Sequence, residues 1–505
     1  MHMAANFYRF QLSNKPYTCM LFLETGLVVL YGLCLVFMLG FSLTQWQLTR
    51  LARRASPLPA PPAPTAWPLV TVQLPVYNEL NVIERLLDAA AALDYPRERL
   101  RIQVLDDSTD ETVALVAARV AHYQALGCFI AHVRRPSRQG YKAGALAHGL
   151  AETDGEFIAI FDADFLPEPD FLRRVIPYFT SPNIGMVQTR WGHLNEHASL
   201  LTRLQAFGLN AHFLVEQVGR QAGGHFLNFN GTGGVWRRTC IVDAGGWHAD
   251  TLTEDLDLSY RAQLRGWRFG YLPQVVAPAE LPTHLDALQS QQHRWNKGAA
   301  ETARKHLGRV WRAPALSVAT KLHATFHLLN SSVFAVILVM ALLSVPLVWV
   351  RAHRPGFEPA FRLAAGFVLT LLPLGYYYYT AWRRAGPRAG YWFGPTFGLF
   401  LALSMGLALR NARAVLQGFL GQVSPFVRTP KLGASHSPAL PARRYRLPET
   451  GQLPLAEGLL TLYFLAGLAS GFYYGSYGLL PFHGLLVAGF GTLTGYALRQ
   501  RLAGN

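Results

Sequence analysis

Apolar and polar positions divide the chain into parts with different patterns. The first is an uncharged apolar run over residues 25–49, which is long enough to cross about 30 Å of hydrocarbon. It predicts a transmembrane anchor within residues 1–49. Arginines and a stretch rich in proline and alanine follow, and they predict a semi-rigid linker over residues 50–68.

Residues 69–300 have the pattern of an α/β domain. Short runs rich in β-branched residues alternate with helical patterns, and the predicted strands cover residues 71–77, 101–107, 129–135, 156–164 and 185–191. This alternation implies a mostly parallel sheet with helices on both faces. Polar residues gather just after the predicted strands, at the sheet edge where open α/β folds bind ligands.

The pattern changes again after residue 300. Mixed basic and apolar residues over 301–322 predict an amphipathic helix on the membrane surface. Residues 323–505 predict a transmembrane region, because uncharged apolar runs cover residues 328–350, 363–382, 391–409, 458–477 and 479–498. A basic loop over residues 410–446 separates the third run from the fourth.

Composition agrees with a membrane protein. Hydrophobic residues make up 51% of the chain and charged residues 15%, against about 25% charged in soluble domains. A net charge of +16 would also fit a nucleic-acid-binding protein, but the basic residues concentrate beside the apolar runs. We therefore expect a lipid bilayer and no nucleic acid as a partner.

Two acidic motifs within residues 69–300 suggest chemistry, and each has an ordinary structural alternative. Asp162 and Asp164 end a predicted strand, where both could bind one divalent cation or simply form a solvated turn. Thr253, Glu254 and Asp255 start a helical pattern in which neighbouring acids repel. Repulsion raises a pKa, as a general base requires, whereas the same residues also suit a helix cap.

A third motif is Gln291-Gln292-His293-Arg294-Trp295. Its arginine could bind a diphosphate through two donors, and its tryptophan offers a flat face to a sugar ring. A tryptophan–arginine pair could equally anchor a helix at the membrane interface. The residues of this motif leave both interpretations open.

The order of the motifs resembles that of the processive family 2 glycosyltransferases, the group of the cellulose synthases. Along residues 70–300 the order is Asp106 and Asp107, Asp162-x-Asp164, Thr253-Glu254-Asp255, and Gln291-x-x-Arg294-Trp295. The cellulose-synthase-like A and C branches, which make mannan, glucomannan and glucan backbones, are most similar at residues 140–146 and 229–232. Residues 426–431 resemble the gating-loop motif of this group, within a predicted gating loop near 424–446, although Arg428 stands where the motif has valine.

The resemblance implies a GT-A fold and an inverting transfer of a hexose from UDP-glucose or GDP-mannose, with Mg²⁺ or Mn²⁺ as cofactor. The product would be a growing β-linked polysaccharide, of β-glucan or β-mannan type, that the membrane region translocates. The alternative is transfer of a single sugar to a lipid acceptor, which would make a glycolipid.

The resemblance also implies a role for each motif residue. Asp255, with Glu254 beside it, would be catalytic, and Asp255 would take the proton from the acceptor hydroxyl. The metal would bind Asp164 and Asp162. The acceptor would contact Gln291, Trp295 and Thr253, and the nucleotide sugar would contact Asp106, Asp107, Lys142, Asp162, Arg294, Thr429 and Lys431.

Because nucleotide sugars are cytosolic, residues 69–300 should be cytoplasmic in a multi-pass protein of the inner or plasma membrane. If residues 391–409 crossed the bilayer, the basic loop at 410–446 would lie outside, against the positive-inside rule. We therefore expect this run to lie at the interface, which leaves about five crossings.

Overall fold

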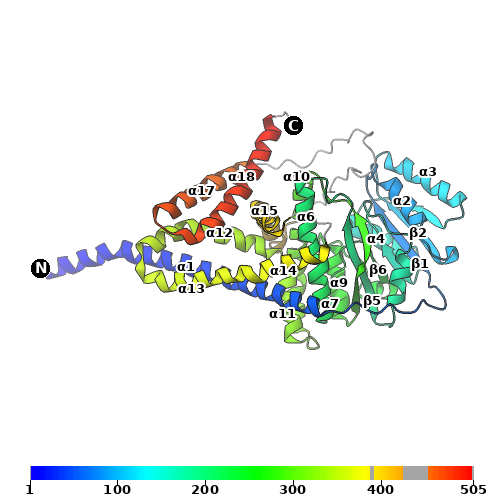
Figure 1. The fold of residues 1–505 in the computed structure, drawn as a ribbon, viewed down its shortest axis with the longest axis horizontal. Helices are drawn as coiled ribbons and strands as arrows, with labels where there is room; N and C mark the ends of the chain where they lie inside the picture. Colours follow the sequence, from blue (N-terminus) through cyan, green and yellow to red (C-terminus); the bar gives the residue numbers. More distant parts are fainter. Residues whose placement is uncertain (1, 387–391, 425–452, 503–505) are drawn as a thin grey trace.

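The structure, a computed structural model, describes residues 2–386, 392–424 and 453–502. An α/β domain lies at one end and a bundle of long helices at the other (Figure 1). The first helix, α1 (His2–Arg54), runs through the bundle beside α14 (Leu371–Ala385) and reaches the α/β domain at its C-terminal end.

The α/β domain is built on a seven-stranded sheet in the order β3-β2-β1-β4-β6-β5-β7. All neighbouring strands are parallel except β6, which runs antiparallel to β4 and β5. The strands are β1 (Val70–Val76), β2 (Leu100–Asp106), β3 (Ile130–Val133), β4 (Phe157–Ile160), β5 (Ile184–His193), β6 (Gly234–Arg237) and β7 (Arg268–Ala279).

The predicted strands all exist, but β6 and β7 were missed. β6 has only four residues, which is too short for a periodic pattern to identify. β7 contains Pro273 and Pro278 and pairs with β5 through register shifts. Prolines in a strand pattern normally argue against a strand, so the sequence pattern pointed away from β7.

Helices cover both faces of the sheet, as predicted. They are α2 (Ile83–Ala91), α3 (Thr112–Ala125), α4 (Tyr141–Ala151), α5 (Phe171–Val175), α6 (Leu200–Ala211), α7 (Gln217–Ala222), α8 (Arg238–Asp243) and α9 (Glu254–Leu264). Strand β4 is buried throughout: Phe157 and Ala159 belong to a core with α2 and α3, whereas Ile158 and Ile160 belong to a core with α4 and α8. A continuous apolar run is typical of a strand that is covered on both faces.

Five helical segments in the described part of the chain are long and apolar enough to cross a membrane: Met20–Arg54, Ser332–His353, Pro355–Ala385, Leu453–Tyr473 and Tyr477–Gln500. These segments correspond to the five predicted crossings. The helices that follow the α/β domain are α10 (Leu285–Arg312), α11 (Val318–Leu328), α12 (Ser332–His353), α13 (Glu358–Gly366), α14, α15 (Phe393–Gly406), α16 (Ala408–Phe419), α17 (Leu453–Tyr473) and α18 (Leu480–Leu502).

The run predicted to stay at the interface is broken. Helices α15 and α16 meet at a bend of 51°. At 1.5 Å per residue, α15 alone is about 21 Å long, which is shorter than a hydrocarbon core of about 30 Å. Helix α16 packs along α10. The bent pair therefore has the shape of either a broken span or a re-entrant segment, and the predicted interfacial position stays a prediction.

The helix expected over residues 301–322 consists of two elements. Its first half is the end of α10, which begins at Leu285 and carries buried residues such as Ala300, Ala303 and Val310. Its second half belongs to α11, where the Ser317 hydroxyl accepts a hydrogen bond from the Thr320 backbone and caps the helix. The motif at residues 291–295 therefore lies inside a long helix that packs against the α/β domain.

Candidate active site

A cleft opens at the carboxyl ends of β1, β2 and β4. Its empty volume, which includes open solvent, is about 1330 Å³. The structure brings ten of the predicted site residues to its walls: Asp107, Lys142, Asp162, Asp164, Thr253, Glu254, Asp255, Gln291, Arg294 and Trp295.

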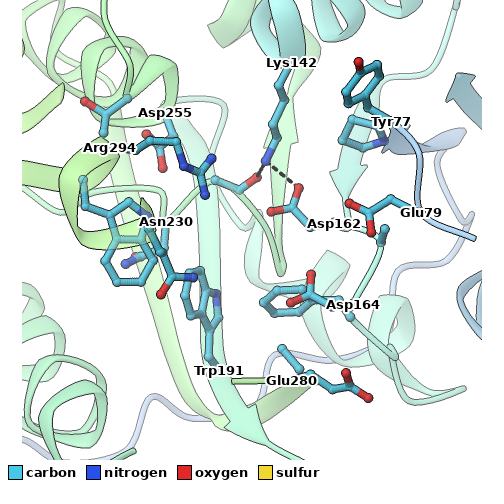
Figure 2. Close-up of a pocket in the computed structure, with 18 of the residues that line it drawn as sticks. Tyr77, Glu79, Lys142, Asp162, Asp164, Trp191, Asn230, Asp255, Glu280 and Arg294 are labelled. Carbon is cyan, nitrogen blue, oxygen red and sulfur yellow. Dashed lines mark hydrogen bonds and ion pairs between the residues drawn. The ribbon is translucent and has the colours of Figure 1, made fainter. Parts of the chain in front are cut away.

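Lys142 connects three walls of the cleft. Its ammonium lies 2.5 Å from Asp162 Oδ1 and 4.0 Å from Glu254 Oε1, and it donates a hydrogen bond to the Gly231 carbonyl at 2.9 Å (Figure 2). Burial alone would lower the pKa of Lys142, but Asp162 and Glu254 raise it above its ordinary value. The lysine is therefore a fixed positive charge inside an acidic cleft.

Two glycines allow this arrangement. Gly140, which precedes α4, has a φ of +71°, in the left-handed region that favours glycine. Gly231 has a φ of +83°, and a Cβ atom there would lie 3.0 Å from Asp255 Oδ2. The loop after Phe229 can therefore bring its carbonyl to Lys142 and its backbone against Asp255 only because residue 231 is glycine.

Asp255 lies in the first turn of α9. Its Oδ1 atom accepts a hydrogen bond from the Leu256 backbone at 2.8 Å. Burial and the neighbouring Glu254 raise the pKa of Asp255 to about 7, and burial also raises the pKa of Glu254. A carboxylate with a pKa near neutrality is suited to general-base catalysis.

Capping does not account for the acidic motif. The Thr253 side chain makes no capping hydrogen bond to α9, and its hydroxyl lies 3.2 Å from that of Thr302 on α10. Gly298 of α10 faces Thr253 so closely that a Cβ atom would approach the threonine Cγ2 to 2.6 Å. This tight contact between α9 and α10 brings Asp255 and Arg294 into one cleft.

The third motif also lies in the cleft. Burial lowers the pKa of Arg294, while the charges of Glu254, Asp162 and Asp164 oppose this change. Trp295 packs near Trp191, with 6.4 Å between ring centroids. Because these side chains line the cleft, the motif is part of the site and not a membrane anchor.

The acidic residues after β4 fit a divalent cation. Asp162 and Asp164 line the cleft on the same side as Glu79 (Figure 2), and carboxylate oxygens are the ligands that Mg²⁺ and Mn²⁺ prefer.

A second group of potential metal ligands, His248, Asp250 and Asp257, has its ligand atoms within 4.8 Å of one another. Asp257, however, already binds Arg261 at 2.8 Å and His306 at 2.7 Å, and it binds Lys305 at 2.8 Å. We interpret this second group as a structural charge cluster behind α9.

Asp106 and Asp107 differ in position. Asp107 lines the cleft, and Arg135 binds both of its oxygens at 2.7 and 2.6 Å. Asp106 is buried at the end of β2, where its carboxylate binds His132 and the Ser108 backbone, each at 2.8 Å. Asp106 is not among the residues that line the cleft, so this geometry favours Asp107 for direct contact with a ligand.

Thr429 and Lys431 lie outside the described residues. The described chain before them ends at Ser424, whose hydroxyl accepts a hydrogen bond from Lys297. Val423 and Ser424 line a second cavity together with Lys142 and Glu254. Ser424, the last described residue before them, therefore lies close to the cleft.

The cleft also contains residues that were not predicted, among them Trp191, His193, Asn230 and Glu280. Trp191 and His193 end β5, and Glu280 follows β7. The signal that could have identified Trp191 was its place at the end of a predicted strand. Asn230 lay in a noted motif, but nothing in the sequence showed that its side chain enters the cleft.

Comparisons with known proteins agree with this geometry. Residues 68–298 match the family described as Glycosyltransferase like family 2. The mannosyltransferase PcManGT from Pyrobaculum calidifontis, solved in complex with GDP-Man and Mn²⁺, has a TM-score of 0.55 at 22% identity, over 79% of this chain and 100% of that chain. This likeness confirms the predicted GT-A fold.

Sequence relatives place the chain within a branch. The probable glucomannan 4-beta-mannosyltransferase 3 of Oryza sativa subsp. japonica is 47% identical over 245 residues, 48% of this chain and 44% of that protein. The probable glucomannan 4-beta-mannosyltransferase 15 of Arabidopsis thaliana is 34% identical over 427 residues, 81% of this chain and 75% of that protein. The chain spans about half the length of the first of these relatives. It belongs to the family 2 glycosyltransferases, in the cellulose-synthase-like branch that contains the glucomannan 4-beta-mannosyltransferases.

Proposed function

We propose that this chain transfers mannose from GDP-mannose to the end of a β-linked mannan-type polysaccharide, with inversion at the anomeric carbon. The observation that carries the proposal is the meeting of Lys142, Asp162, Asp255 and Arg294 in one cleft. Of the two donors expected from the sequence, GDP-mannose is favoured because the relatives named above are mannosyltransferases.

Different residues of the cleft act on the acceptor and on the leaving group. Asp255 accepts the proton of the acceptor hydroxyl as this hydroxyl attacks the anomeric carbon, and a single displacement of an α-linked donor produces a β-linkage. Arg294 and Lys142 stabilise the charge that develops on the departing diphosphate. A divalent cation held by Asp162 and Asp164 would supply further neutralisation of that charge when bound.

The remaining predicted residues bind the nucleoside, the acceptor sugar and the diphosphate. Asp107 contacts the nucleoside, and Asp106 fixes the end of the strand beneath it. Trp295 provides a flat surface for the acceptor sugar, with Gln291 and Thr253 near it. Thr429 and Lys431 contact the diphosphate, the lysine as a point charge, and the membrane helices form the exit path of the polymer.

Donor choice and product size test this function. The full-length chain in lipid nanodiscs is incubated with GDP-mannose or UDP-glucose plus Mn²⁺, and release of GDP or UDP is measured. We expect GDP release together with a product that elutes as a polymer and that endo-β-1,4-mannanase degrades. Release of UDP alone would show that the donor is UDP-glucose and not GDP-mannose. A lipid-extractable product with one mannose would favour the glycolipid alternative.

The proposal places residues 69–300 in the cytoplasm and predicts the topology of the bent pair α15–α16. We expect Pro387→Cys and Ser435→Cys, made one at a time on either side of this pair, to become accessible from the same cytoplasmic face. An impermeant thiol reagent applied to sealed inverted and right-side-out vesicles measures this, with the parent chain as the background control. Labelling of the two positions from opposite faces would show that the pair crosses the membrane.

A further inference from the structure

A partly buried chain of hydrogen bonds that the chemistry above does not use leads into the cleft. It begins at Glu216, passes through His212 and ends on the Asn230 side chain, which lines the cleft. The segment His212–Glu216 is a π-helical turn between α6 and α7. Such turns are rare overall but are enriched at functional sites, and this one places His212 within hydrogen-bonding distance of Asn230.

The hydrogen bonds determine how the Asn230 carboxamide is oriented. Its Oδ1 atom accepts from Gln217 Nε2 at 2.9 Å, and Gln217 is itself oriented by the Asn228 carbonyl at 3.1 Å. With the opposite orientation, two NH₂ groups would face each other. Asn230 Nδ2 therefore donates to His212 Nε2 at 2.9 Å.

This orientation in turn determines the tautomer of His212. Because Nε2 accepts the hydrogen bond from Asn230, the proton of the neutral ring is on Nδ1. Nδ1 lies 3.1 Å from Glu216 Oε2 and donates to it. The carboxylate, the imidazole and the carboxamide thus form one directed chain.

Glu216 is the charged end of this chain of hydrogen bonds. Its other oxygen accepts from Arg220 at 2.7 Å, and the Arg220 side chain is 1% exposed. Burial would raise the pKa of Glu216, but Arg220 and His212 lower it well below its ordinary value. A carboxylate that is charged, buried and paired is held in one position, so it can orient the imidazole.

Asn230 has hydrogen-bonding capacity beyond these contacts. A carboxamide offers two N–H groups and two lone pairs, and the contacts with His212 and Gln217 use one of each. Asn230 lies on the side of the cleft that holds Asp255 and Arg294, with Trp191 below it in the view and Tyr77 and Glu79 opposite (Figure 2). This is the side where an acceptor hydroxyl must approach the general base.

We propose that His212 and Glu216 are positioning residues that hold the Asn230 carboxamide so that it binds a hydroxyl of the acceptor sugar. The inference rests on the proposed function, because it takes the acceptor to be a sugar that approaches Asp255. It adds residues of the membrane-proximal helices to acceptor binding: the anchor Glu216 lies in the turn that contacts α1 and α14.

The test compares acceptor binding with donor hydrolysis. In Asn230→Ala and in His212→Phe, we expect the KM for mannohexaose to rise about tenfold, which corresponds to about 1.4 kcal/mol. In His212→Phe, the rate at which GDP-mannose is hydrolysed without acceptor should stay within about twofold, because His212 does not line the cleft. His212→Gln should restore part of the affinity, since its Oε1 atom can accept from Asn230 Nδ2.

A matched control is His323→Phe. His323 is a buried histidine of α11 that stacks on His225 at 3.8 Å between ring centroids, and it has no hydrogen bond to Asn230. The control should change neither KM nor hydrolysis. An unchanged KM in His212→Phe, or a fall in hydrolysis that matches the fall in transfer, would overturn the positioning role.

A binding measurement separates this inference from the proposed function. Mannohexaose and cellohexaose are titrated into the GDP-bound full-length protein in nanodiscs, and binding is followed by tryptophan fluorescence. If the wild type binds cellohexaose and not mannohexaose, the proposed sugar is wrong. In that case, weaker binding of cellohexaose to His212→Phe than to the wild type would still support the positioning role. Equal binding of cellohexaose to the two proteins would overturn it.

Discussion

Asp255→Asn is expected to lower sugar transfer by about 10²–10⁴-fold, the usual loss when a general base is removed. The amide has nearly the same shape as the carboxylate but cannot accept the proton of the acceptor hydroxyl. Donor affinity should stay close to that of the wild type, because Lys142, Asp162 and Arg294 remain. Turnover assays together with calorimetric titration of GDP-mannose measure the two quantities, and wild-type turnover in this variant would end the assignment.

The pH dependence of the wild type follows from the same carboxylate. A general base must be deprotonated to act, and the pKa of Asp255 is raised to about 7 by burial and by Glu254. Transfer should therefore fall as the pH drops through about 7 and should level off above it. A rate that stays constant between pH 5 and pH 8 would contradict the role of Asp255.

Asp164→Asn is expected to remove most of the metal-dependent part of donor binding, and with it most of the transfer. Chelation with EDTA should inactivate the wild type, and Mn²⁺ should restore it. Calorimetric titration with GDP, with and without Mn²⁺, measures the effect: the metal should strengthen GDP binding in the wild type but not in the variant.

Asp250→Asn is the matched control for the metal site. Asp250 belongs to the second acidic group, where it binds Lys305 at 2.7 Å. If that group is structural, this substitution should leave the effect of Mn²⁺ on GDP binding unchanged. A loss of the Mn²⁺ effect in Asp250→Asn, with the effect retained in Asp164→Asn, would move the metal to the second group.

The motifs around Asp255 and Arg294 come together through a contact between two helices. Thr253 and Gly298 are 45 residues apart in the sequence, yet α9 and α10 touch at these two positions. A side chain at residue 298 would push α10 away from α9 and would move Arg294 relative to Asp255. The small residue after the third motif is therefore part of what assembles the cleft.

The sequence by itself determined the broad organisation. Apolar periodicity located the strands whose residues are buried on both faces and identified five segments long enough to cross a membrane, because both signals are local and extend over many residues. The order of short motifs indicated the family. Polar residues after the strands located the cleft, since the carboxyl ends of parallel strands meet at one edge of a sheet.

Only the tertiary structure decided which of those residues face one another. Asp106 and Asp107 are neighbours in the sequence, but strand geometry points them in different directions, so one binds His132 in the interior and the other enters the cleft. β6 was too short and β7 too rich in proline to be read from local periodicity. The hydrogen bonds from Glu216 through His212 to Asn230 depend on a π-helical turn and on a contact between residues that are 18 positions apart. Sequence spacing alone cannot specify either.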